Sequence, residues 1–142
     1  MNIFDVEKDT HLVDFHKDVT LRDPKSADGC VEVLTSDGKK GTLSHVPIHT
    51  NTEQFSKDLR QKIGEGRIPV CLSGGLDTKD SANLVCGLKI DLANEGFDIK
   101  DERNDTGGNA TRRTTLFAER VEIEKIDYAT GKAEKRLLRK FF

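Results

Sequence analysis

The sequence predicts an α+β protein, with a mixed β-sheet or sandwich core flanked by two or three helices. Two segments, residues 52–63 and 81–95, carry apolar residues at helical spacing, and strand-like segments lie before, between and after them. Strands and helices do not alternate strictly, which argues against a doubly wound parallel sheet. The chain has 142 residues, enough to bury a core without disulfide bonds, so we expect one domain over residues 1–142.

The charge balance argues against two classes of partner. The chain has 23 Lys and Arg residues against 25 Asp and Glu residues, giving a net charge of -2 at pH 7. We therefore expect no general binding of nucleic acid and no membrane insertion. No apolar run approaches the roughly 20 residues of a spanning helix, and the N-terminus lacks the basic start and apolar core of a signal peptide. The expected location is the cytoplasm, with secretion as an effector left open.

The three cysteines do not form the even set of a disulfide framework. Cys30, Cys71 and Cys86 stand in scattered contexts, and neither they nor the four histidines repeat a zinc-ligand spacing. We therefore expect no metal site and no cofactor. Cys71 within a strand and Cys86 between apolar helical neighbours are predicted to be small buried residues.

The N-terminal part of the chain is predicted to be extended. Residues 12–21 carry apolar side chains mostly at odd positions, which fits one strand or two short ones. Residues 22–29 form a turn-rich link, because Pro24 argues against a central strand. Residues 31–34 and 42–46 are predicted to be antiparallel strands, joined by a glycine-containing turn over residues 36–41.

Two helices follow, with a strand between them. Thr50 and Glu53 have the spacing of a capping box, and the first helix is expected to stop before Gly64. The second helix is expected to begin with Asp80 or Ser81 as its cap. Apolar residues at four-residue spacing define the buried face of each helix: Phe55, Leu59 and Ile63 in the first, and Leu84, Leu88 and Leu92 in the second. Between them, residues 67–72 are predicted to be a short buried strand with Pro69 at its start or edge.

The C-terminal part is predicted to return to strands. A polar loop over residues 101–109 leads into one long strand, residues 111–126, and a last strand, residues 132–142, with a turn over residues 127–131. Basic residues gather in the last strand, which we interpret as a solvated charged face.

The predicted hairpin places a thiol near an imidazole. Cys30 opens the first strand and His45 closes the second, and these ends of an antiparallel pair lie close together. An imidazole that takes the proton of a thiol generates the attacking thiolate, so the pair indicates nucleophilic catalysis. Gly29 lets the backbone before Cys30 adopt conformations closed to other residues.

A second set of motifs resembles the CheD family of chemoreceptor glutamine deamidases. Its most distinctive element is an acidic, threonine, double-glycine, asparagine loop before a basic strand. The resemblance spans nearly the whole chain, although each motif is short. The matching residues are Thr20-Leu21, Gly29-Cys30-Val31, Ser44-His45-Val46, Asp105-Thr106-Gly107-Gly108-Asn109 with Arg112 and Arg113, and Thr130-Gly131.

The resemblance implies a cysteine-dependent protein-glutamine glutaminase. It implies that Cys30 is the nucleophile, His45 the base and Thr20 the residue that orients the imidazole. The segment before Cys30 is longer than in the family, so Ser26 is an alternative to Thr20. The implied reaction hydrolyses the side-chain amide of glutamine to glutamate and ammonia through a thioester. The implied partners are a protein with an exposed glutamine and a chemotaxis protein such as a CheC-like phosphatase. The resemblance also implies a fold shared with glutamine-deamidating bacterial toxins.

Two other functions compete with this interpretation. Residues 73–78, Ser-Gly-Gly-Leu-Asp-Thr, resemble the pyrophosphate-binding loop of ATP pyrophosphatases, in which glycine N–H groups and a helix N-terminus bind phosphate. That family needs further parallel strand and helix units after the loop, and here mostly strand-like sequence follows. The chain could also be a protein-binding module that keeps the fold without activity.

Overall fold

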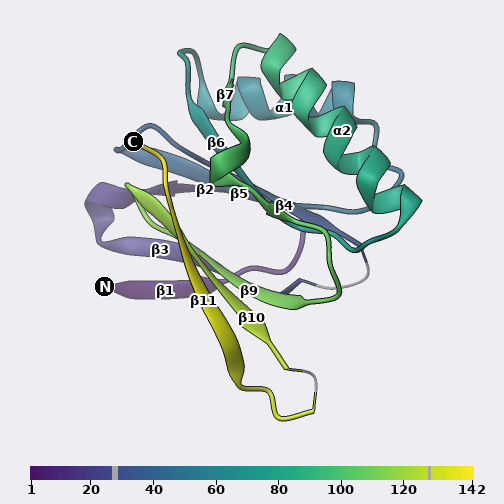
Figure 1. The fold of residues 1–142 in the computed structure, drawn as a ribbon. Coiled ribbons are helices and arrows are strands. Elements are labelled where there is room, and N and C mark those ends of the chain that lie inside the picture. The colour runs from purple at the N-terminus through teal and green to yellow at the C-terminus, as the bar shows by residue number, and fades with distance from the viewer. Residues whose placement is uncertain (27–28, 128) are drawn as a thin grey trace.

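The protein is a two-sheet sandwich with both helices on the outer side of one sheet (Figure 1). The computed structural model describes residues 1–26, 29–127 and 129–142. One sheet, sheet A, has the strand order β1-β3-β9-β10-β11, and the other, sheet B, has the order β2-β5-β4-β6-β7, with β8 also pairing with β6. The predicted α+β class with a sheet-rich core is confirmed.

The strands are β1 (Asn2–Asp5), β2 (Thr10–Asp14), β3 (Val19–Ser26), β4 (Val31–Ser36), β5 (Lys40–Val46), β6 (Pro69–Gly74), β7 (Asp98–Ile99), β8 (Asp105–Thr106), β9 (Thr111–Leu116), β10 (Arg120–Ile126) and β11 (Ala133–Lys140). The helices are α1 (Thr52–Ile63) and α2 (Lys79–Asn94), with short 3₁₀ helices at Phe15–Lys17 and Asp101–Arg103.

The apolar side chains of sheet B pack into two layers, one on each face of the sheet, because successive residues of a strand point to opposite faces. Val31 and Val33 pack toward the helices, whereas Leu34 packs toward sheet A. Because successive side chains point to opposite faces, Glu32 shares the inter-sheet face with Leu34. The layer under the helices contains Val31, Val33, Val46, Leu59, Ile63, Ile68, Val70, Leu72, Leu84, Leu88, Leu92 and Phe97. The inter-sheet layer contains Val13, Leu21, Leu34, Leu43, Cys71, Leu116, Val121, Ile123 and Phe141.

The hairpin on which the sequence argument depends is confirmed. β4 and β5 pair antiparallel, with Val31 opposite Val46 and Glu32 opposite His45. The bounds of α1 agree with the prediction, but Asn51 caps this helix by accepting from the Gln54 N–H, while the Thr50 hydroxyl donates to the Pro47 carbonyl. Thr78, rather than Asp80 or Ser81, caps α2. A capping side chain must immediately precede the first helical turn, and spacing alone left that position ambiguous.

The link predicted over residues 22–29 is wrong in its first part. β3 continues through Pro24 to Ser26, and it lies between β1 and β9 rather than at an edge. The pairing of β3 with β9 shifts register between Asp23 and Ser26, and such an irregularity accommodates a residue that has no N–H to donate. Residues 27 and 28 of the predicted link lie outside the described residues. Asp23 is therefore buried inside the sandwich instead of lying in a surface turn.

The C-terminal prediction also needs correction. Residues 111–126, which the sequence predicts to be one strand, form a hairpin of β9 and β10, in which Val121 pairs with Leu116. β1 was not predicted, and it adds a parallel edge strand beside β3. β11 is the other edge of sheet A and exposes most of its charged side chains, as expected for a solvated strand. Tyr128, in the predicted turn after β10, lies outside the described residues.

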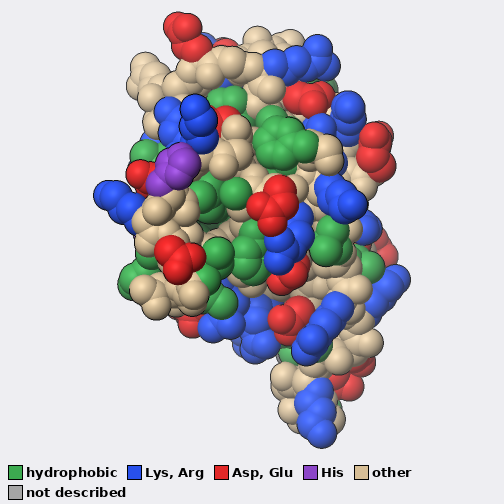
Figure 2. Space-filling model, turned by 90° about the vertical axis from the view of Figure 1, so that its left-hand side faces the viewer, with side chains coloured by type: hydrophobic (Ala, Val, Ile, Leu, Met, Phe, Trp, Pro, Cys, Tyr) green, Lys and Arg blue, Asp and Glu red, His purple; other side chains and the backbone are tan. Residues whose placement is uncertain are grey.

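The surface mixes both signs of charge on the face that Figure 2 shows, the left-hand side of Figure 1. Lys and Arg side chains alternate there with Asp and Glu, around patches of hydrophobic side chains. In the described part of the chain, no helix has the length and apolar character needed to cross a membrane.

Candidate active site

The hairpin brings Cys30 and His45 close together. Glu32 lies directly opposite His45, and Cys30, immediately before the first residue of β4, lies close enough to raise the pKa of the imidazole. Cys30 is half-buried, and the His45 side chain is 19% exposed. The thiol and the imidazole are thus neighbours at one end of the hairpin, where the ring still reaches solvent.

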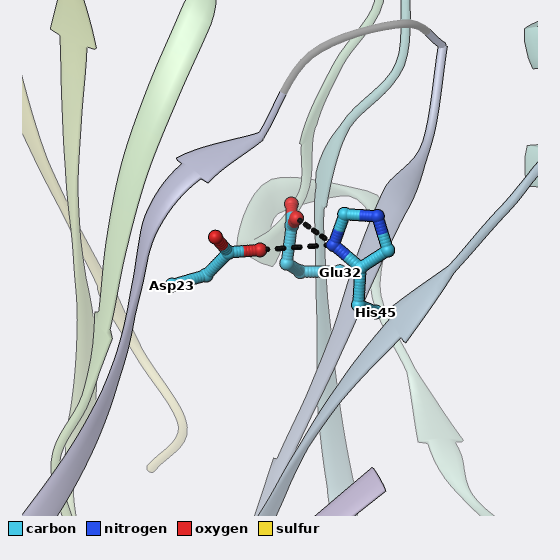
Figure 3. A group of neighbouring side chains, drawn as sticks. All are labelled: Asp23, Glu32 and His45. Atoms are coloured by element: carbon cyan, nitrogen blue, oxygen red, sulfur yellow. Dashed lines mark hydrogen bonds and ion pairs between the residues drawn. The ribbon is translucent and has the colours of Figure 1, made fainter. Parts of the chain in front are cut away.

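Two buried carboxylates contact the Nδ1 atom of the His45 ring. Nδ1 lies 3.1 Å from Oδ2 of Asp23, on β3, and 3.3 Å from Oε1 of Glu32, on β4 (Figure 3). Asp23 and Glu32 are both fully buried. The cluster therefore joins the two sheets, because Asp23 belongs to sheet A and the other two residues belong to sheet B.

The carboxylates change the protonation of the site. Hydrogen bonding to Asp23 and then to Glu32 raises the pKa of His45 to about 11, and the Cys30 thiol adds to this effect. Burial raises the pKa of Glu32 to about 8. The two acceptors at Nδ1 therefore favour the protonated form of the imidazole.

The structure does not bring Thr20 to the imidazole. Thr20 is buried on β3, but among the described residues its hydroxyl has no hydrogen-bond partner, and His45 Nδ1 faces Asp23 and Glu32 instead. The Ser26 hydroxyl, the alternative, also lacks a hydrogen-bond partner in the described part of the chain. The orienting position is occupied by Asp23, three residues after Thr20.

Sequence reasoning missed both carboxylates for identifiable reasons. Asp23 precedes Pro24, and that dipeptide resembles a turn. Glu32 alternates with Val31 and Val33, which is the pattern of a strand with one solvated face, but sheet A covers that face. The sequence did contain a signal for Glu32, because the predicted hairpin register places this acidic residue opposite His45.

The loop after β6 fixes the backbone of the nucleophile. The Gly75 N–H donates to the Cys30 carbonyl at 2.8 Å. Gly74 has φ +113, and a Cβ there would lie 2.7 Å from the Cys30 carbonyl oxygen and 3.0 Å from Glu32 Oε2. Only glycine allows this close approach, so the double glycine serves the Cys30 turn.

The same loop does not form a pyrophosphate site. The N–H of Gly75 donates to Cys30, that of Leu76 to the Ser81 hydroxyl, and that of Asp77 to the Gly108 carbonyl. A phosphate-binding nest needs such N–H groups to be free. In addition, β6 pairs antiparallel with β4, and its parallel neighbours β7 and β8 have two residues each. The ATP-binding alternative thus lacks three of its loop donors and the parallel sheet that it needs.

The other two cysteines lie away from this site and differ from each other. Cys71 is buried as predicted, and burial raises the pKa of its thiol to about 12. Its thiol donates to the Arg103 carbonyl. Cys86 is exposed, so its prediction as a buried residue is wrong. Its apolar neighbours in sequence do not share its face of α2, because residues one apart on a helix point in different directions.

Comparisons with known proteins support the fold and leave the family undecided. No family model matches the chain, and no curated protein matches it. Among solved structures, the chain is similar to the C-terminal domain of CNFy from Yersinia pseudotuberculosis, with a TM-score of 0.57 and 11% identity over 98% of this chain. The match spans 62% of that chain's length. The likeness shows a shared α+β fold, and membership of the CheD family remains a prediction.

Proposed function

We propose that this chain is a cysteine-dependent protein-glutamine deamidase, with Cys30 as nucleophile, His45 as acid and base, and Asp23 as the residue that orients His45. The observation that carries the proposal is the buried Asp23 carboxylate 3.1 Å from His45 Nδ1, in the hairpin that brings Cys30 close to the same ring. A thiol, an imidazole and an orienting acceptor are the parts that an activated thiolate requires. The shared fold with the CNFy domain supports the scaffold that the sequence resemblance implies.

The reaction would proceed in two steps. His45 holds the proton of the Cys30 thiol, and the thiolate attacks the amide carbon of a glutamine side chain. The charge that develops on oxygen is met by the Cys30 N–H, which donates to no backbone carbonyl among the described residues. His45 returns the proton to the leaving nitrogen, and ammonia departs. Water, activated by His45, then hydrolyses the thioester to glutamate and frees the thiol.

Asp23 would act through the ring and not on the substrate. Its carboxylate accepts a hydrogen bond from the Nδ1–H group and compensates the charge of the imidazolium in a buried setting. The proposed substrate is a protein with an exposed glutamine, because the partly exposed His45 ring and the half-buried Cys30 can be reached from solvent. A CheC-like partner remains a prediction from the sequence resemblance.

Mass spectrometry of a protein substrate tests this proposal. Wild-type protein, incubated with chemoreceptor cytoplasmic fragments and with unfolded carboxymethylated casein, should add about one dalton to individual glutamines and release ammonia. Cys30→Ser should do neither, and Cys86→Ser, which changes an exposed cysteine away from the site, should match wild type. Equal deamidation by wild type and Cys30→Ser would overturn the assignment of the nucleophile.

Alkylation separates the enzyme from a silent module of the same fold. In the folded protein, iodoacetamide should modify Cys30 faster than the exposed Cys86, and His45→Ala should remove that advantage. Cys71 should stay unmodified because it is buried. Equal rates at Cys30 and Cys86, unchanged in His45→Ala, would leave a binding module as the better interpretation.

A further inference from the structure

The cluster behind His45 has more acceptors than one proton can serve. Nδ1 carries at most one hydrogen, yet two carboxylate oxygens lie 3.1 Å and 3.3 Å from it. Among the described residues, neither carboxylate oxygen of Glu32 has a hydrogen-bond partner that meets normal geometry, although both are buried. These buried oxygens need a proton or a cation as partner, and one bound cation could serve both carboxylates and the imidazole nitrogen at once.

A second orphaned group points into the same place. The hydroxyl of Ser26 is buried and has no hydrogen-bond partner among the described residues. A Cβ on Gly74 would lie 3.1 Å from this hydroxyl and 3.0 Å from Glu32 Oε2, so both atoms border the same glycine. Oxygens from β3 and β4 that lack hydrogen-bond partners among the described residues thus converge beside Gly74.

The spacing of the donor atoms fits a cation. One ligand atom each from Asp23, Glu32 and His45 lies within 4.8 Å of the others. Zinc binds imidazole nitrogen and carboxylate oxygen at about 2.0–2.2 Å, and tetrahedral geometry then separates neighbouring ligand atoms by about 3.3 Å. The separations from Nδ1, 3.1 Å and 3.3 Å, are close to that value. One imidazole with two carboxylates is also a donor set that suits zinc or cobalt.

We propose that Asp23, Glu32 and His45 bind one divalent ion of the zinc type through Oδ2, Oε1 and Nδ1. Cys30 does not belong to this group of neighbouring ligand atoms in the described chain, so the fourth position falls to water. The ion would connect β3 of sheet A with β4 and β5 of sheet B. This consequence depends on the proposed deamidase function: a bound ion would replace the Nδ1 proton and slow the reaction of Cys30.

Metal titration of the full chain tests the site independently of any enzyme activity. After removal of metal with a chelator, calorimetric titration with Zn²⁺ should show uptake of one ion per chain. Co²⁺ should give the intense visible bands of a four-coordinate site, without a thiolate charge-transfer band. Glu32→Gln and Asp23→Asn should each weaken binding by more than about tenfold. Glu119→Gln, which changes an exposed carboxylate on the surface, should bind as wild type does.

The two proposals can fail separately. Cys30→Ser should bind Zn²⁺ as wild type does while losing deamidation. Loss of deamidation therefore does not imply loss of zinc binding. No uptake from an equimolar Zn²⁺ solution, or unchanged binding by folded Glu32→Gln, would overturn the metal site. If Glu32→Gln does not fold, the wild-type Co²⁺ spectrum still decides, since a pale six-coordinate spectrum contradicts the three-residue site.

Discussion

Two buried charged clusters connect the sheets, and they differ in how completely their atoms are paired. In the first, Arg112 on β9 donates to Asp105 Oδ2 at 2.9 Å and to the carbonyls of Gly75 and Gly107, while Lys125 lies 3.2 Å from Asp105 Oδ1. In the second, His45 alone faces Asp23 and Glu32, and the oxygens of Glu32 lack hydrogen bonds among the described residues.

The difference separates a structural cluster from a chemical one. Each nitrogen of the Arg112 guanidinium reaches an acceptor, so this network holds the loops at Gly75 and Gly107 in place. The His45 cluster keeps acceptors without hydrogen-bond partners among the described residues and has a raised imidazole pKa, and such perturbed groups concentrate at functional sites.

The largest expected effect comes from removing the charge of Asp23. Asp23→Asn keeps the size of the side chain but no longer favours the imidazolium with the correct Nδ1 proton, so the proposed deamidation rate should fall by about 10²–10⁴-fold. Thr20→Val removes the hydroxyl that the sequence resemblance favoured, and it should leave the rate near that of wild type. Steady-state ammonia release measures both, and a large loss in Thr20→Val with none in Asp23→Asn would restore the sequence-based assignment.

Breaking the paired cluster should affect stability. Arg112→Met leaves the Asp105 carboxylate and two carbonyls short of donors in a buried place, so the free energy of unfolding should fall by about 3–5 kcal/mol. Arg113→Met, next in sequence, removes a half-exposed pair with Glu124 and should cost less than about 1 kcal/mol. Urea denaturation measures both variants, and similar losses would contradict the contrast between them.

The smallest expected effect is the change in stability between pH 5 and 6.5 that comes from Glu32, at most about 2 kcal/mol. Folding raises the pKa of this carboxyl from 4.5 to about 8, so the folded chain keeps a proton that the unfolded chain releases. Its stabilisation is complete below pH 4.5, declines as the pH rises, and is lost above about 8, with a slope of at most about 1.4 kcal/mol per pH unit. The raised pKa of His45 acts in the same direction, but only from about pH 6.5 upward.

Denaturation of metal-free protein between pH 5 and 6.5 therefore isolates Glu32. Wild type should lose stability across this window, and Glu32→Gln, which cannot titrate, should show a flatter dependence. Parallel curves for the two proteins would mean that Glu32 is already ionised in the folded state.

Much of the local structure could be predicted from the sequence. The alternation in residues 31–34 and 42–46, with glycines between them, indicated the β4–β5 hairpin and therefore the proximity of Cys30 and His45. Four-residue apolar spacing indicated α1 and α2. These signals are local, because hairpin pairing and helix periodicity depend on residues close together in the chain.

What the sequence by itself determined is therefore the pair of candidate residues, Cys30 and His45, and the hairpin that carries them. Only the tertiary structure decided what lies behind the imidazole. Glu32 follows the pattern of a solvated strand face, and Asp23 precedes a proline, so neither appeared as a core residue. Packing of sheet A over sheet B buries both, since burial depends on which distant strand covers a face, and strand periodicity does not encode that contact.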